Sequence, residues 1–312
     1  MGSDGTELVV IAGPTAAGKS EVSLELAGHV KGQVISADSM QVYRYMDIGS
    51  AKLPENARRG IRHHLIDVLE PTDDFNVSVF KDMAVQSMER IRSSGDMPII
   101  CGGTGFYIQA VINDIDFAEG ETDADIRREL EELAEKEGIH HMEDMLQQTD
   151  PEYAAISRGN LKRIIRALEY HRLTGKKMSE KNAAGRNKAP AYNTAYIVLT
   201  MPRDILYKRI DTRVDPMMRA GFLGEVRKLK DMGVKREMTS MQGLGYRQLY
   251  DHLEGCYDLE TAVDEIKKQT RHFAKRQLTW FRREKDVTWI DVTQYEDAGE
   301  IAEWISTNII KR

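Results

Sequence analysis

The sequence has few cysteines and no long apolar run, and these absences limit the classes of protein it can encode. Only Cys101 and Cys256 are cysteines, so a framework of several disulfide bonds is excluded. No stretch approaches the roughly 20 apolar residues of a membrane-spanning helix. Residues 1–7 are polar and do not read as a secretory signal. We therefore expect a soluble, cytoplasmic protein with no membrane partner.

Internal repeats and low-complexity tracts are also absent, so a solenoid or repeat array is not expected. Hydrophobic residues make up 41% of the chain and charged residues 30%, as in an ordinary globular protein. A chain of 312 residues is long enough for one large domain or two smaller ones.

Charge is unevenly distributed along the chain. The net charge of -6 argues weakly against a nucleic-acid partner, and residues 119–152 carry 13 acidic against 3 basic residues. In contrast, residues 158–188 carry 10 basic against 2 acidic residues, and residues 267–285 carry 8 basic against one acidic residue. Two basic segments in an acidic chain could form a local nucleic-acid footprint. Either segment alone is better explained as a solvated helix face.

The most informative stretch is residues 8–20, where an apolar run leads into a glycine-rich loop and then a helix. The apolar run 8–12 predicts a buried strand. The loop follows the P-loop pattern and consists of Gly13, Pro14, Thr15, Ala16, Ala17, Gly18, Lys19 and Ser20. Such a loop points backbone N–H groups and a helix N-terminus at a phosphate, its lysine adds a charge, and its Ser20 hydroxyl can meet Mg²⁺. The pattern predicts a phosphate or pyrophosphate ligand without specifying ATP.

Asp38 follows a second expected strand, which includes Val34 and Ile35. Ligands of open α/β sheets bind outside the carboxyl ends of the strands, so Asp38 is expected close to the phosphate loop. A general base could stand there, but a turn or helix-capping aspartate explains the residue equally well.

Strands and helices alternate in the first part of the chain. Strands are expected at 63–69 and 98–102, and helices at 77–91 and from Phe106 onward; the paired His63 and His64 are assigned a structural role. This alternation predicts a parallel sheet with helices on both faces.

After residue 115 the pattern is helical up to about 181, with helices at 125–137 and 161–170 and a loop at 179–193. A strand at 196–200, helical segments at 203–231, a glycine-bearing turn at 241–246, a helix at 262–283 and a strand at 287–290 follow. The long helix 262–283 has an apolar side to which we assign Gln277. We predict an α/β fold, a P-loop NTPase-like parallel sheet core (1–115 and 190–312) with a helical insertion domain (116–189).

Seven blocks of the sequence resemble those of tRNA dimethylallyltransferases. They are Gly13–Ser20, Ala37–Arg44, Met46–Gly49, Gly102–Tyr107, Arg166–Glu169, Gly245–Gln248 and Ala274–Phe281, and they occur in the family's order. The resemblance spans residues 9 to about 291. One departure is Ser20, where many members carry Thr, and both side chains offer a hydroxyl.

The resemblance implies that a dimethylallyl group moves from dimethylallyl diphosphate to N6 of the adenosine just 3′ of the tRNA anticodon. Asp38 would take the proton, residues Gly13–Ser20 would hold the diphosphate, and Thr104 would face the base. Lys19, Arg213 and a magnesium ion at Ser20 would neutralise the charge that builds on pyrophosphate. The base would be flipped out of the anticodon loop to reach the site.

The resemblance also implies a set of tRNA contacts, and two of the regions involved coincide with the basic segments. We expect a monomer that binds the tRNA anticodon stem-loop, although the sequence does not determine the oligomeric state. The implied tRNA-binding residues are Asp38, Ser39, Met40, Gln41, Thr104, Arg127, Lys162, Arg163, Ile164, Ile165, Arg166, Met241, Gln242, Gly243, Leu244, Gly245, Tyr246, Arg271, Lys275 and Arg276.

Three other functions compete with this one. A P-loop small-molecule kinase would use ATP but has no need of a basic helical insertion. An adenylate prenyltransferase would share the P-loop and the aspartate but has no use for tRNA-facing helices. A non-catalytic RNA-binding module leaves the P-loop unexplained. Protection from thermal unfolding by a triphosphate, a diphosphate or RNA would discriminate between them.

Overall fold

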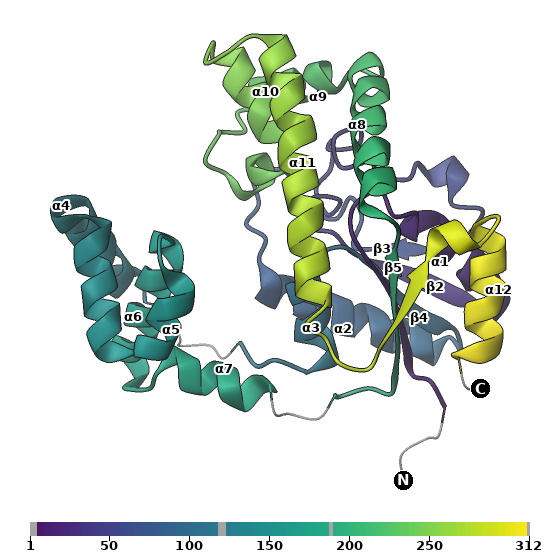
Figure 1. Cartoon of the computed structure of the whole chain (residues 1–312), viewed down its shortest axis with the longest axis horizontal. Coiled ribbons are helices and arrows are strands. Elements are labelled where there is room, and N and C mark those ends of the chain that lie inside the picture. Colours follow the sequence, from purple (N-terminus) through teal and green to yellow (C-terminus); the bar gives the residue numbers. More distant parts are fainter. Residues whose placement is uncertain (1–4, 118–122, 187–189, 311–312) are drawn as a thin grey trace. The chain divides into compact units, whose positions relative to one another are not determined.

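Residues 5–117, 123–186 and 190–310 are described by the computed structural model, and they belong to two units (Figure 1). The first unit comprises residues 1–112 and 191–312, and the second comprises residues 113–190. Each is described separately below.

A parallel sheet is the centre of the first unit. Its strands are β1 (Leu8–Ala12), β2 (Gly32–Ala37), β3 (His63–His64), β4 (Met97–Gly102), β5 (Thr194–Thr200) and β6 (Val287–Asp291). Their order across the sheet is β3-β2-β4-β1-β5-β6, and every neighbouring pair is parallel. The predicted α/β fold is confirmed.

The expected strand 63–69 ends after His64, because Leu65 and Asp67 adopt positive φ values of 61° and 56° that no strand allows.

The helices of this unit are α1 (Lys19–Val30), α2 (Val77–Ser93), α3 (Gly105–Ile112), α8 (Arg203–Arg219), α9 (Phe222–Asp231), α10 (Tyr246–Leu253), α11 (Leu259–Phe281) and α12 (Ala298–Asn308). They pack on both faces of the sheet and, at α9 and α10, on other helices beyond it (Figure 1). Short 3₁₀ turns are η1 (Glu55–Ala57), η2 (Thr239–Gln242) and η3 (Val292–Gln294).

Alternation along β1 explains why two separate cores form. Leu8, Val10 and Ala12 belong to one buried cluster, and Val9 and Ile11 belong to the other, because successive side chains of a strand point to opposite faces. All five side chains are fully buried. Helices α1 and α12 pack against each other on the second face.

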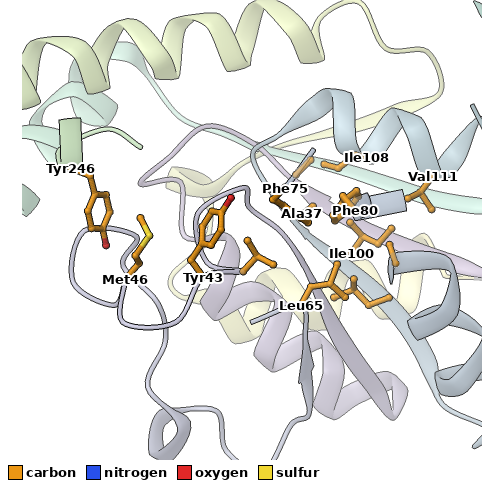
Figure 2. Close-up of a cluster of buried hydrophobic side chains, with 14 of the residues drawn as sticks. Ala37, Tyr43, Met46, Leu65, Phe75, Phe80, Ile100, Ile108, Val111 and Tyr246 are labelled. Atoms are coloured by element: carbon orange, nitrogen blue, oxygen red, sulfur yellow. The ribbon is translucent and has the colours of Figure 1, made fainter. Parts of the chain in front are cut away.

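The first cluster joins the sheet to α2 and α3. Figure 2 shows Phe80 of α2, and Ile108 and Val111 of α3, beside Ile100 of β4. This packing fixes where β4 ends and α3 begins, and therefore where the loop that contains Thr104 lies.

The second unit is helical, with α4 (Ala124–Thr149), α5 (Pro151–Ser157), α6 (Leu161–Thr174) and α7 (Met178–Arg186). The helix expected at 125–137 continues to Thr149 with a kink at Gly138, whose φ is 82°. The loop prediction for 179–193 is wrong over 179–186, where α7 lies. Asp150, only 2% exposed, accepts a hydrogen bond from the Ser179 N–H at 2.8 Å and holds the start of this helix. Part of the expected loop, 187–189, lies outside the described residues.

Candidate functional site

The P-loop joins the end of β1 to the start of α1. Gly13 has a φ of 142°, and a Cβ on it would lie 2.5 Å from the carbonyl oxygen of Leu199, so only glycine fits. Gly18 stands at the N-cap of α1 with a φ of 86° and offers no side chain to the first N–H groups of the helix. Within the described residues no side chain caps these N–H groups, so they can meet an anion, and phosphate binding by this loop stays a prediction.

Two cations lie in this site under conditions that favour an anionic ligand. Burial lowers the pKa of Lys19 to about 8, and the nearby Arg213 adds to this, whereas Cys101 and Asp38 oppose it. Burial also lowers the pKa of Arg213, and Asp38 opposes this shift. The Lys19 Nζ donates to the Pro14 carbonyl at 2.7 Å. Because the two cations have lost part of their hydration, a bound diphosphate would interact strongly with both.

Asp38 follows the last residue of β2 and has the turn role that the sequence allowed, whereas its role as general base stays a prediction. Its Oδ1 accepts hydrogen bonds from the N–H groups of Met40 at 2.8 Å and Gln41 at 3.4 Å, which makes it a turn aspartate. Its charge acts on Lys19 and Arg213. Within the described residues Oδ2 accepts no hydrogen bond, so this oxygen is available to take a proton.

The residues after Asp38 differ in how they are used. Ser39 and Met40 are partly exposed. Gln41 is held by the protein: it accepts from the Ser36 hydroxyl at 2.9 Å and donates to the Ser50 carbonyl at 3.3 Å. The role of these three residues as tRNA contacts stays a prediction.

Thr104 lies in the loop between β4 and α3, close to the end of β2. Its N–H donates to the Ala37 carbonyl at 3.3 Å, so it stands beside the residue that precedes Asp38. Gly102 approaches β2 so closely that a Cβ would lie 2.3 Å from the Ala37 carbonyl oxygen. The structure therefore brings Thr104, Asp38 and the P-loop together at one edge of the sheet.

Sequence reasoning missed the polar residue that joins two of these loops. Gln277 of α11 is 6% exposed, accepts from the Thr15 N–H at 2.9 Å and donates to the Gly103 carbonyl at 2.9 Å. Helical periodicity places it on the apolar side of its helix and gives it no polar role. The only signal in the sequence is an amide within a stripe of otherwise apolar or weakly polar residues.

Ser20 is exposed and also borders a small hollow whose polar lining residues include Ser36, Gln41 and His63. No group of three or more His, Cys, Asp or Glu side chains able to hold a metal ion occurs in the described part of the chain. One hydroxyl fits Mg²⁺ only where phosphate oxygens and water complete an octahedral shell. The donor set therefore suits a magnesium ion that arrives with a diphosphate.

The first basic segment presents its cations on one side of α6. Lys162, Arg163 and Arg166 are exposed, whereas Ile164 and Ile165 are buried at 1% and 6% exposure. None of the three cations forms an ion pair with a described residue. The two isoleucines hold the helix in the second unit, so of these five predicted contacts the three cations are the ones with exposed side chains.

Arg127 of α4 is held by a buried acid. Its Nη2 donates to Oε2 of Glu169 at 2.6 Å, and Glu169 also accepts from the Asp123 N–H at 2.9 Å. Glu169 is fully buried, while the Arg127 side chain is 41% exposed. The pairing fixes the direction of a guanidinium that is still accessible.

The turn at 241–246 is mostly internal. Met241 and Tyr246 are fully buried, Gly243 and Gly245 are buried, and Gln242 is exposed. Leu244 is partly exposed. Any tRNA contact by the side chains of Met241 or Tyr246 would need a rearrangement of the core, because both pack in the first cluster.

Tyr246 belongs to a network centred on Glu225 of α9, which the sequence did not indicate. Its hydroxyl donates to Glu225 Oε1 at 2.6 Å and accepts from the Ser50 N–H at 3.2 Å. Glu225 also accepts the N–H groups of Asp47 at 2.9 Å, Ile48 at 2.8 Å and Gly49 at 3.1 Å. The network positions the loop that follows Asp38.

The second basic segment lies mainly on α11. Lys275 and Arg276 are exposed, with the Arg276 guanidinium 5.7 Å from the centre of the Phe273 ring. Arg271 instead pairs with Asp211 of α8 at 2.5 Å, so its charge is largely compensated within the protein. Two of the three predicted contacts on this helix are therefore free of an ion pair among the described residues.

None of the helices in the described ranges combines the length and apolar character needed to cross a membrane.

Comparisons with known proteins agree on one family. The model of the family described as IPP transferase matches residues 41–284. A tRNA dimethylallyltransferase of Lachnoclostridium phytofermentans is 51% identical over 300 residues, which is 96% of each chain. The crystal structure of a full-length tRNA isopentenylpyrophosphate transferase from Bacillus halodurans is similar with a TM-score of 0.73 and 42% identity, covering 97% of this chain and 96% of that one. A eukaryotic dimethylallyltransferase acting on tRNA has a TM-score of 0.81 at 27% identity, with 98% and 81% covered.

Proposed function

Because the chain belongs to the IPP transferase family of tRNA dimethylallyltransferases, we propose that it transfers a dimethylallyl group from dimethylallyl diphosphate to tRNA. The acceptor is N6 of the adenosine immediately 3′ of the anticodon, and pyrophosphate is released. The observation that carries this proposal is a carboxylate, Asp38, which stands beside a phosphate loop and acts on both Lys19 and Arg213.

The loop of residues 13–18 surrounds the diphosphate of the donor, and the N–H groups at the start of α1 bind it. The bond between the allylic carbon and the diphosphate oxygen breaks, and its electron pair stays on pyrophosphate. Lys19 and Arg213 stabilise the charge that develops there, which favours the transition state over the bound substrate. A magnesium ion held by Ser20 and the phosphate oxygens would add further charge neutralisation.

Asp38 acts at the acceptor. The N6 amine forms the new bond to the allylic carbon and gives up one proton, which Asp38 Oδ2 takes as general base. Thr104 and the residues up to Gln41 face the flipped base. The exposed cations Lys162, Arg163, Arg166, Lys275 and Arg276 bind phosphates of the anticodon stem-loop.

The protein acts as a monomer in the cytoplasm. Free Cys101 and Cys256 support a reducing compartment. Sedimentation of the purified chain at the concentration of the assay tests the oligomeric state.

The assay that tests the function uses labelled dimethylallyl diphosphate with and without total tRNA, followed by nuclease digestion to identify the modified nucleoside. Label on adenosine 3′ of the anticodon is expected, without ATP. Label on free AMP, ADP or ATP alone would favour the adenylate prenyltransferase, and phosphoryl transfer from ATP would favour the kinase.

A further inference from the structure

One side of α11 packs directly on the loop between β4 and α3. A Cβ on Gly103 would lie 2.1 Å from Gln277 Nε2, and a Cβ on Gly105 would lie 2.2 Å from Trp280 Cδ1. Gln277 and Trp280 are three residues apart and so occupy the same face of the helix. The contact leaves no space between helix and loop, so α11 determines where this loop lies.

Both ends of the Gln277 amide are used, and each reaches a different loop. Oε1 accepts the Thr15 N–H of the P-loop at 2.9 Å, and Nε2 donates to the Gly103 carbonyl at 2.9 Å. The partners are 262 and 174 residues away in the sequence. A side chain required only to fill the core would be apolar at this position, because a buried amide is costly unless it is fully paired.

In the proposed function, these two loops serve the two ends of the transferred group. Thr15 belongs to the loop proposed to hold the diphosphate. Gly103 precedes Thr104, whose N–H binds the Ala37 carbonyl next to Asp38, the proposed base. The chain of contacts therefore runs from the donor side, through one amide, to the acceptor side of the reaction.

We propose that Gln277 is a positioning residue that fixes the distance between the diphosphate loop and the Asp38–Thr104 edge, and so aligns the allylic carbon with the attacking amine. The proposal rests on the proposed function. Transfer between two bound substrates depends on the approach of the reacting atoms, and a displacement of about 1 Å can cost on the order of 100-fold in rate.

Two substitutions test this role. Gln277→Met keeps the approximate volume and removes both hydrogen bonds. Gln277→Glu keeps an acceptor for the Thr15 N–H but loses the donor to the Gly103 carbonyl. Lys19, the N–H groups at the start of α1 and the tRNA-facing cations are unchanged in both variants. The lost hydrogen bonds allow the two loops to shift relative to each other, so we expect kcat to fall roughly 10- to 100-fold. For Gln277→Met, the KM for dimethylallyl diphosphate and the Kd for tRNA are expected to change less than about threefold, because no charge near the P-loop changes. Gln277→Glu places a negative charge beside the loop, so its KM for the diphosphate should rise as well.

Thr279→Ala is the matched control. Thr279 lies two residues further along α11, is exposed, and its hydroxyl donates within the helix to the Lys275 carbonyl at 2.9 Å. Its kcat should equal that of the wild-type chain. Circular dichroism at the assay temperature checks that all variants are folded.

Folded Gln277 variants whose kcat stays within twofold of wild type would overturn the proposal, as would a loss confined to KM. Variants that are both unfolded would assign Gln277 to stability and overturn it as well. If the wild-type chain itself transfers no label to tRNA, the proposed function fails and this proposal with it. Transfer by wild type and Gln277→Met at equal rates would refute this proposal alone.

Discussion

The exposed cations of α6 allow a quantitative test of tRNA binding. The change is the triple substitution Lys162→Gln, Arg163→Gln and Arg166→Gln. All three side chains are exposed, and none pairs with an acid among the described residues. Removing them therefore leaves no buried partner unsatisfied, and the buried stripe that includes Ile164 and Ile165 is unchanged. The melting temperature should stay close to that of wild type.

The magnitude follows from counterion release. Each phosphate contact to single-stranded RNA contributes about 0.7 to the slope of log affinity against log salt, so three contacts contribute about 2. When the salt concentration rises fourfold, the Kd of wild type for tRNA should therefore increase by a factor roughly 16 times larger than that of the variant. Fluorescence anisotropy of a labelled anticodon stem-loop, titrated at several salt concentrations, measures this slope.

A control variant removes three other cations. Lys31→Gln, Arg59→Gln and Arg92→Gln affect residues outside both basic segments, each paired with an acid, Asp96, Glu25 and Glu7 respectively. Its salt slope should match that of wild type, although the net charge changes by the same amount. An unchanged slope in the folded α6 variant, or an equal decrease in the control, would refute the assignment of these residues to tRNA binding.

Three further predictions follow from the site and the fold. Asp38→Asn should lower the rate about 10²–10⁴-fold with tRNA affinity within a few-fold of wild type, and a rate above a tenth of wild type would argue against Asp38 as base. Burial, together with Arg62 and Arg90, lowers the pKa of His64 to about 4. Between about pH 6.5 and pH 4, His64 is therefore protonated in the unfolded chain but not in the folded one, and stability falls as the pH falls through this window. The urea midpoint of His64→Asn should decrease less than that of wild type over the same pH range. Glu225→Gln should destabilise the protein by about 1–3 kcal/mol in urea unfolding, because a carboxylate that accepts three backbone N–H groups loses its charge; a change below about 0.5 kcal/mol would contradict that reasoning.

Several features are predictable because they depend on consecutive residues. The strand, glycine loop and helix of residues 8–30 follow from an apolar run, two glycines that allow positive φ, and a helical pattern. On α6 the 3.6-residue period of the sequence is enough to separate the buried isoleucines from the exposed cations.

Other predictions are wrong where distant residues decide local structure. The polar composition of 179–186 favours a loop, yet a buried carboxylate from Asp150 caps this stretch as helix α7. The composition of this segment is compatible with a loop or a helix, and packing selects the helix. The tRNA contacts expected of Met241 and Tyr246 stay predictions, although the side chains of both residues are buried in the core.

The sequence by itself determined the α/β class, the strand, glycine-rich loop and helix of residues 8–30, and the exposed residues of α6, since backbone geometry and helical period are encoded in neighbouring residues. Only the tertiary structure decided which buried polar groups meet. Gln277 joins Thr15 to Gly103, and Glu225 holds the loop after Met46, across separations of more than 170 residues. The physical reason is that the partner of a buried polar group depends on strand order and helix packing, which bring together residues that carry no local sign of their pairing.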